Sequence, residues 1–471
     1  MIIVILDEFP GDHMLGPDGV PDPVRFPAFT RLARRAYWFP NASTWSPATS
    51  TAVPAILDGR LPRAGVPPTS GGHPVSLYTA LGRAGYRIVN GEETTALCPQ
   101  RLCARLAIRS PPCRVRSCRF IRPGRVRRFE RWLATVRPST TPTLWVKHLL
   151  VPHRPWIYLP SGLQTQPSGR LKNPITGLNR FGGPSDAFVR LHNYQRHLLQ
   201  LRFADTLVGR LLDRLARRGM FHQSLVVVTS DHGYSFVGGR GEHRRLGPRN
   251  VHQIAPVPLF LKLPRQRTGH RQDTYAVNAD VAPTVAGAVG VPLGGPPDGA
   301  PLLGAAVRSR GSFLLADKVG VSPAAFLQRR EAWNRRRLRL FGFGRHGFWD
   351  GIGPSRQLVG RRVSQIRFRS AGRPRAEFIF ADRLRRLRRA SGIWPIQIGG
   401  RLRRVSRRRR YALAVAVNGR IEAVGRSFHL PGDRAAHFAM MIPPRSLQQG
   451  RNRIRLFHIR PGGPLRLLGR I

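Results

Sequence analysis

The sequence has 471 residues, which is too long for one ordinary domain and fits two or three. Hydrophobic residues make up 41% of it, so the chain can bury a sizeable core and is not intrinsically disordered. Its formal net charge is +55, almost entirely from arginine. This charge favours an anionic partner such as an ester, a lipid or a polymer, with a solvated arginine-rich surface as the alternative. Specific recognition of nucleic acid is not expected.

The N-terminus carries no export or membrane signal. No stretch approaches 18 consecutive apolar residues, so a membrane span is not expected. The segment MIIVILDEFP lacks the basic start of a signal peptide and predicts a first β-strand instead. A strand that begins almost at residue 1 is expected where an upstream segment, such as a membrane anchor, has been removed. Association with a membrane surface therefore stays open.

The four cysteines lie close together in the sequence. Cys98, Cys103, Cys113 and Cys118 have the spacing C-x4-C-x9-C-x4-C. This spacing favours two short disulfides, which form in an oxidising compartment. A zinc site is the alternative, although the usual C-x2-C knuckles are missing. We therefore expect a location in the cell envelope or facing the outside of the cell.

Up to residue 305, the pattern alternates between strands and helices. Buried strands are predicted at 2–6, 86–89, 143–150, 225–229 and 257–263, and helices at 26–36, 76–83, 186–218 and 281–289. Apolar strands separated by helices are typical of a mostly parallel sheet with helices on both faces. Residues 1–305 are thus predicted to form an α/β domain.

The pattern changes after a segment rich in Gly and Pro at residues 292–312. Residues 306–359 are rich in arginine and predict a connecting region. From residue 360 onward, apolar and polar residues alternate with period two, and the turn dipeptide Asn418-Gly419 separates two such runs. Residues 360–471 are therefore predicted to form a small antiparallel β-sandwich as an accessory domain.

Acidic and imidazole side chains follow two of the predicted strands. Asp7 and Glu8 end the first strand, and Asp231 and His232 follow the strand at 225–229. In open α/β sheets, ligands bind at the carboxyl ends of strands. Carboxylate and imidazole groups together bind divalent cations, although a strand that simply ends at acidic residues is the alternative for Asp7.

Small hydroxyl residues precede an apolar helical segment that ends at Gly59. Thr49, Ser50 and Thr51 stand at its start, where a helix has free N–H groups and a positive field. Capping of the helix explains such residues without any function. The functional interpretation is a threonine nucleophile that binds a metal ion and reacts as an alkoxide.

In this order, the segments resemble the sulfatase-like branch of the alkaline phosphatase superfamily. Val151–Trp156 is similar to the Pro-His-x-Pro segment of that family, and Asp280–Thr284 is similar to its Asp-x-x-Pro-Thr segment. The resemblance covers about residues 1–305 and implies an alkaline phosphatase-like fold. It also implies a metal site whose ligands are Asp7, Glu8, Thr49, Asp231 and His232.

The resemblance places the nucleophile ten residues before Gly59, at Thr49, with Thr51 as the second candidate. Sulfatases convert a Cys or Ser within Cys/Ser-x-Pro-x-Arg to formylglycine, and this chain has no such segment. A threonine is more similar to the envelope phosphoethanolamine and phosphoglycerol transferases, which form a phosphothreonine. The resemblance thus implies transfer or hydrolysis of a phosphate ester rather than a sulfate ester.

Other residues are candidates for contacts with the substrate. His153 is predicted to act as acid or base on the leaving oxygen, and the candidates for contacting the anion are His148, His243 and Lys262. One divalent ion is expected, with calcium, magnesium, manganese and zinc all open. Two alternatives remain, namely a sulfuric ester hydrolase and a catalytically degenerate protein that binds an anionic polymer.

Overall fold

The computed structural model describes the chain except residues 62, 64, 104–123, 167–185, 238–244, 371–374, 407–408 and 431–434. The described residues form two compact units. The first contains Met1–His153, Leu201–Val237 and His243–Arg336, and the second contains Arg154–Gln200 and Arg337–Ile471. In this described part of the chain, no helix is both long and apolar enough to cross a membrane.

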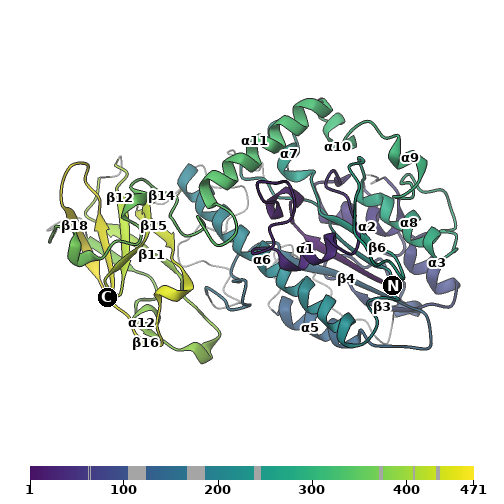
Figure 1. The fold of residues 1–471 in the computed structure, drawn as a ribbon, viewed down its shortest axis with the longest axis horizontal. Coiled ribbons are helices and arrows are strands. Elements are labelled where there is room, and N and C mark those ends of the chain that lie inside the picture. The colour runs from purple at the N-terminus through teal and green to yellow at the C-terminus, as the bar shows by residue number, and fades with distance from the viewer. Residues whose placement is uncertain are drawn as a thin grey trace. The chain divides into compact units, whose positions relative to one another are not determined.

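The first unit is built on a seven-stranded sheet with the order β3-β4-β1-β5-β6-β2-β7 (Figure 1). Its strands are β1 (Ile2–Asp7), β2 (Tyr37–Trp38), β3 (Arg87–Gly91), β4 (Thr143–Pro152), β5 (Val226–Ser230), β6 (Leu259–Lys262) and β7 (His270–Arg271). Strands β3, β4, β1 and β5 are parallel, whereas β6 runs antiparallel to both β5 and β2. The predicted mostly parallel α/β sheet is confirmed.

Helices cover both faces of this sheet (Figure 1). On the face of Ile3 and Ile5 lie α2 (Thr49–Asp58), α3 (Leu77–Arg83) and α8 (Val281–Ala288), whose apolar side chains join one buried cluster with the strands. On the other face lie α1 (Pro27–Ala33), α5 (Arg125–Thr135) and the part of α6 (Ala187–Arg217) from Leu201 onward. Each fully buried aliphatic side chain contributes about 1.5–3 kcal/mol, so the sheet is a rigid base for groups at its edge.

Shorter helices and one longer helix complete the first unit. They are α4 (Gln100–Cys103), α7 (Val251–Ile254), α9 (Ala305–Arg308), α10 (Leu314–Asp317) and α11 (Pro323–Phe341), of which the residues up to Arg336 belong to this unit. Helix α11 begins the part of the chain in which arginine is densest. Arg330 on this helix donates to both carboxylate oxygens of Asp12, at 2.9 and 2.6 Å, and so ties α11 to the segment that follows β1.

The second unit contains two larger β-sheets with the orders β14-β15-β11-β9 and β13-β12-β17-β18-β8, and a two-stranded sheet of β10 (Arg386–Leu387) and β16 (Gly450–Arg451). The strands of the larger sheets are β8 (Phe368–Ser370), β9 (Arg375–Phe378), β11 (Gln397–Arg403), β12 (Ala412–Val417), β13 (Arg420–Arg426), β14 (Phe428–His429), β15 (Ala436–Met441), β17 (Ile454–His458) and β18 (Leu465–Arg470). All pairs are antiparallel except β8 with β18. A Cβ added at Gly425 would lie 2.8 Å from Met440, so the two sheets pack closely. The predicted antiparallel C-terminal region is confirmed.

Candidate active site

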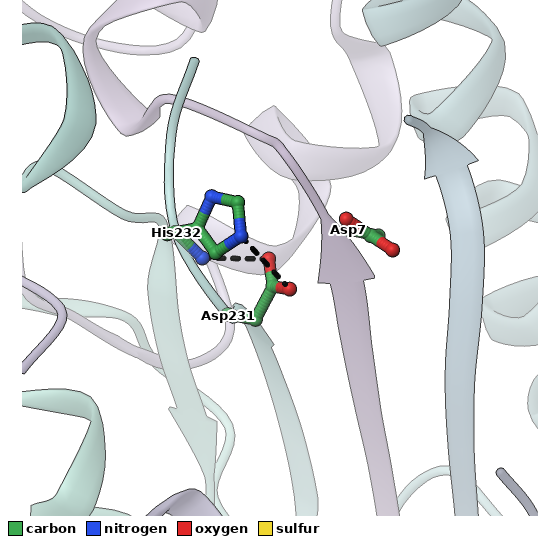
Figure 2. A group of neighbouring side chains, drawn as sticks. All are labelled: Asp7, Asp231 and His232. Atoms are coloured by element: carbon green, nitrogen blue, oxygen red, sulfur yellow. Dashed lines mark hydrogen bonds and ion pairs between the residues drawn. The ribbon is translucent and has the colours of Figure 1, made fainter. Parts of the chain in front are cut away.

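The carboxyl ends of β1 and β5 bring three acidic and imidazole side chains together. Strand β1 pairs with β5 up to Leu6 and Ser230, and the Asp231 N–H donates to the Leu6 carbonyl at 3.0 Å. Asp7, Asp231 and His232 therefore stand side by side at this edge (Figure 2). All three are at most 1% exposed.

The two carboxylate oxygens of Asp231 have different surroundings. Its Oδ1 accepts the Glu8 N–H at 3.1 Å and the His232 N–H at 2.6 Å. No hydrogen bond from the described residues reaches Oδ2, which lies 3.5 Å from His232 Nε2. A buried oxygen without a hydrogen bond is costly unless a cation binds it. Oδ2 is therefore suited to be a metal ligand.

The ring of His232 is oriented by its neighbour. Its Nδ1 lies 2.8 Å from the Gly233 carbonyl, and only a protonated nitrogen can donate to that oxygen. The proton on Nδ1 leaves a lone pair on Nε2, which is the usual arrangement for a histidine that binds a metal. Position 233 has to be glycine, because a Cβ there would lie 2.3 Å from the Gln253 carbonyl oxygen.

These side chains fit a divalent cation. Donor atoms of Asp7, Asp231 and His232 all lie within 4.8 Å of one another, and so do those of Asp7, Glu8 and His153. Each group combines carboxylate oxygens with one imidazole nitrogen, and such ligands suit calcium, magnesium, manganese or zinc. Asp7 belongs to both groups and is the centre of the arrangement.

Helix α2 brings the hydroxyl of Thr49 to this edge. It is the first residue of α2, and its Oγ1 lies 3.4 Å from His232 Nε2. Thr51 instead donates to the Ala48 carbonyl at 2.9 Å and lies 2.5 Å from the Ser46 hydroxyl. The two candidate threonines thus have different surroundings, and Thr49 is the one next to the acidic cluster.

Two histidines lie beside the carboxylates, one within β4 (His148) and one directly after it (His153). His153 Nε2 lies 3.5 Å from Glu8 Oε1, and His148 Nε2 lies 3.7 Å from Asp7 Oδ2. Burial lowers the pKa of His148 to about 4, against the opposing effect of Asp231. His148 is therefore neutral at neutral pH. Arg125 holds the chain here by donating to the carbonyls of Leu150 and His153, at 2.8 and 2.5 Å.

Other predicted site residues lie elsewhere or outside the described residues. Lys262 pairs with Val226 at the start of β5, at the opposite edge of the sheet from Asp231. Its Nζ donates to three backbone carbonyls, those of Phe221, His222 and Ser224. A disulfide joins Cys98 and Cys103. The residues outside the described part are Cys113, Cys118 and His243.

Two supporting residues were not predicted from the sequence. The Ser230 hydroxyl accepts the Phe9 N–H at 3.1 Å and donates to the Leu6 carbonyl at 2.9 Å, which joins the two strand ends. The Asn278 amide donates to the Asp231 carbonyl at 3.1 Å. Ser230 had a signal in its position directly before Asp231, whereas Asn278 begins a short 3-10 helix (Asn278–Asp280) that has no distinctive sequence pattern.

The Sulfatase family model matches residues 1–291. Among solved structures, a protein from work on glycosaminoglycan metabolism by Bacteroides thetaiotaomicron has a TM-score of 0.46 and 16% identity, covering 64% of this chain and 75% of that chain. The phosphonate monoester hydrolase of Silicibacter pomeroyi has a TM-score of 0.43 and 16% identity, with coverages of 68% and 83%. The phosphonate monoester hydrolase of Agrobacterium radiobacter has a TM-score of 0.42 and 15% identity, covering 64% of this chain and 76% of that chain. No curated protein sequence matches significantly.

Proposed function

The chain belongs to the sulfatase family, and from this premise we propose that it cleaves or transfers a phosphate ester group through Thr49 as nucleophile. Membership of the family makes it a sulfatase-like hydrolase. The choice of phosphate over sulfate and the role of Thr49 are the steps that we add. The observation that carries the role of Thr49 is the 3.4 Å distance between its Oγ1 and His232 Nε2 beside the acidic cluster, and the choice of phosphate rests on this residue being a threonine.

Asp7, Glu8, Asp231 and His232 are proposed to hold one divalent cation. A bound cation supplies positive charge that favours ionised threonine and stabilises the negative charge of the transferring group. Two main-chain N–H groups hold the carboxylate of Asp231 in place, so this ligand needs little rearrangement when the substrate binds. Helix α2 adds its N-terminal positive field at Thr49.

In the first step, Thr49 Oγ1 attacks phosphorus and the bond between phosphorus and the leaving oxygen breaks. The leaving oxygen has to take up a proton, and His153 is proposed to give it. His153 is buried, and its Nε2 lies 3.5 Å from Glu8 Oε1, so the ring stands beside the carboxylates at this edge of the sheet. Water or another hydroxyl then attacks phosphorus and gives its proton to His153, while the bond between phosphorus and Thr49 Oγ1 breaks. This step completes hydrolysis or transfer and restores Thr49.

The threonine favours phosphate over sulfate for a chemical reason. Formylglycine is made from Cys or Ser, and the segment around Thr49 contains no Cys/Ser-x-Pro-x-Arg. A threonine hydroxyl can instead form a phosphate ester that later breaks down. The net charge of +55 suits an anionic ester of either kind and does not decide between them.

The test is turnover of a panel of phosphate monoesters, phosphodiesters and sulfate esters, with each divalent cation added back after chelation. Thr49→Ala is expected to lower turnover of the preferred phosphate ester by at least about 1,000-fold. Thr51→Ala is the matched control and should stay within a few-fold of the unchanged protein. Full activity of Thr49→Ala would rule out the nucleophile.

Sulfate ester hydrolysis is the second candidate, because the matching family model is that of sulfatases. Mass spectrometry of the peptide that contains Ser50 would reveal formylglycine if it formed there. Formylglycine together with turnover of sulfate esters alone would replace the phosphate proposal. A phosphothreonine at position 49, trapped by acid quench during turnover, would support it.

A further inference from the structure

The second unit contains a pocket that is lined mainly by arginine. It has a volume of about 620 Å³ and lies where α12 (Ala381–Arg385), β10 (Arg386–Leu387) and β16 (Gly450–Arg451) meet. Half of its ten lining residues are arginines, namely Arg383, Arg385, Arg386, Arg388 and Arg451. All the described lining residues belong to the second unit, so the pocket is a different place from the acidic cluster of β1 and β5.

The local fold holds these arginines at the pocket. Leu384 and Leu387 are 1% and 2% exposed and anchor the segment from within, while the arginines on either side of them are exposed. In the antiparallel pair of β10 and β16, Arg386 stands directly opposite Arg451. Like charges at directly opposed positions destabilise a strand pair. An anion between the two guanidinium groups would remove this repulsion.

Acidic residues do little to neutralise the pocket. Among the described lining residues, Asp382 alone is acidic, and it lies 3.4 Å from Arg385 with its side chain 97% exposed. Such an exposed pair contributes little, because water screens it. For Arg386, Arg388 and Arg451, no carboxylate of the described residues lies within ion-pair distance. The pocket therefore has an unbalanced positive charge.

We propose that this pocket binds an oligosaccharide that carries sulfate or phosphate ester groups. Guanidinium groups bind tetrahedral oxyanions with two hydrogen bonds at once, which lysine cannot do. Ile393 and Pro395 also line the pocket and offer an aliphatic surface for the C–H face of a sugar ring. Its volume lies within the range of about 300–1,000 Å³ that is usual for ligand pockets.

The same lining disfavours two other polyanions. Single-stranded nucleic acid is bound largely by stacking of bases on aromatic rings, and none of the described residues that line the pocket is aromatic. A membrane surface requires protruding apolar side chains, whereas the apolar lining here is concave. An anionic oligosaccharide is the ligand that matches both the charge and the aliphatic lining.

This inference goes beyond the proposed function, because binding here needs neither Thr49 nor a metal ion. The pocket would retain an anionic polysaccharide on the protein independently of turnover. Asp231→Ala is expected to leave this binding unchanged within two-fold. The binding experiment can thus fail while the enzyme proposal stands, and the reverse also holds.

The test uses the full chain and a fluorescent dextran sulfate oligomer. The variant R386A/R388A/R451A is expected to bind at least ten-fold more weakly at 0.15 M salt. The matched control R361A/R367A/R369A removes the same charge from exposed arginines of the second unit that do not line the pocket. The control should bind within two-fold of the unchanged protein. Equal weakening in both variants would show a general charge effect and overturn the proposal.

Further arms separate the ligands and guard against misfolding. A phosphorylated dextran oligomer of equal charge identifies the preferred ester, and loss of binding to either dextran in the pocket variant supports the proposal. Stronger binding of single-stranded DNA or anionic vesicles, lost in the same variant, would overturn it. In the unchanged protein, the oligomer should protect Arg386, Arg388 and Arg451 from phenylglyoxal by at least five-fold. Unprotected pocket arginines would also overturn the proposal.

Discussion

Main-chain hydrogen bonds hold the carboxylate of Asp231 in one orientation at the end of β5. One oxygen accepts two main-chain N–H groups, and the other lies beside His232 Nε2 without a hydrogen bond from the described residues. These main-chain donors fix the orientation of the side chain. A carboxylate that is held this way is prepared for a cation before the cation arrives.

Asp231→Asn should remove metal binding while leaving the fold intact. The amide keeps the shape and one acceptor oxygen, but it loses the negative charge that a divalent cation needs. Removing a residue that hydrogen-bonds to a metal ligand lowers metal affinity by about 10–100-fold. Removing a ligand itself should therefore lower the affinity by more than about 100-fold. Metal analysis after gel filtration should find less than a tenth of an ion per chain.

The control for this prediction is Asp213→Asn, which changes an aspartate that pairs with Arg31 and is 48% exposed. It should keep the metal content of the unchanged protein. If Asp231→Asn also kept its metal, then the ion would be bound somewhere other than the acidic cluster at β1 and β5.

At the scale of elements, the strand ends could be predicted because their apolar runs are continuous. The runs at 2–6 and 225–229 correspond to β1 and β5, and parallel strands put their carboxyl ends at one edge. The same reasoning does not give the position of Lys262 at the end of β6. This strand runs antiparallel to β5, and a residue pattern does not show the direction of a strand. Asn278 escaped prediction because contacts made through space leave no periodicity.

The long helix α6 also makes a contact that no sequence pattern shows. Its Asp205 accepts the N–H groups of Ala28 and Phe29 at the start of α1, at 3.2 and 2.9 Å. These N–H groups have no partner within a helix, so the carboxylate caps α1 from a distant part of the chain. Burial raises the pKa of Asp205 to about 7, against the opposing effect of the two hydrogen bonds.

This raised pKa predicts a dependence of stability on pH. A carboxyl group whose pKa is higher in the folded state stabilises it below the unfolded pKa of 3.8 and loses that effect as pH rises to about 7. The loss amounts to about 4 kcal/mol at 1.36 kcal/mol per pKa unit. Urea unfolding of Asp205→Asn should lack this loss, so its stability relative to the unchanged protein should rise between pH 4 and pH 8. A constant or falling difference would contradict the prediction.

The whole molecule is marked by its high net charge and by its division into two units. A formal charge of +55 repels itself, and salt screens this repulsion over about 8 Å at 0.15 M. Measurements at low salt would therefore overstate every interaction with an anion. Each unit also has a hydrophobic cluster of its own, around Ile3 and Ile5 in the first and around Ala414 and Phe457 in the second.

All the proposed metal ligands belong to the first unit, which predicts that metal stabilises one unit selectively. Separate cores favour two calorimetric transitions. A cation at 100 times its dissociation constant adds about 2.7 kcal/mol to the state that binds it. Chelation should therefore lower the midpoint of the first unit by several degrees and leave the other midpoint unchanged. In Asp231→Asn, chelation should move neither. Equal shifts of both transitions would contradict the selective effect, because only a ligand shared by the two units, or a single cooperative unfolding step, produces them.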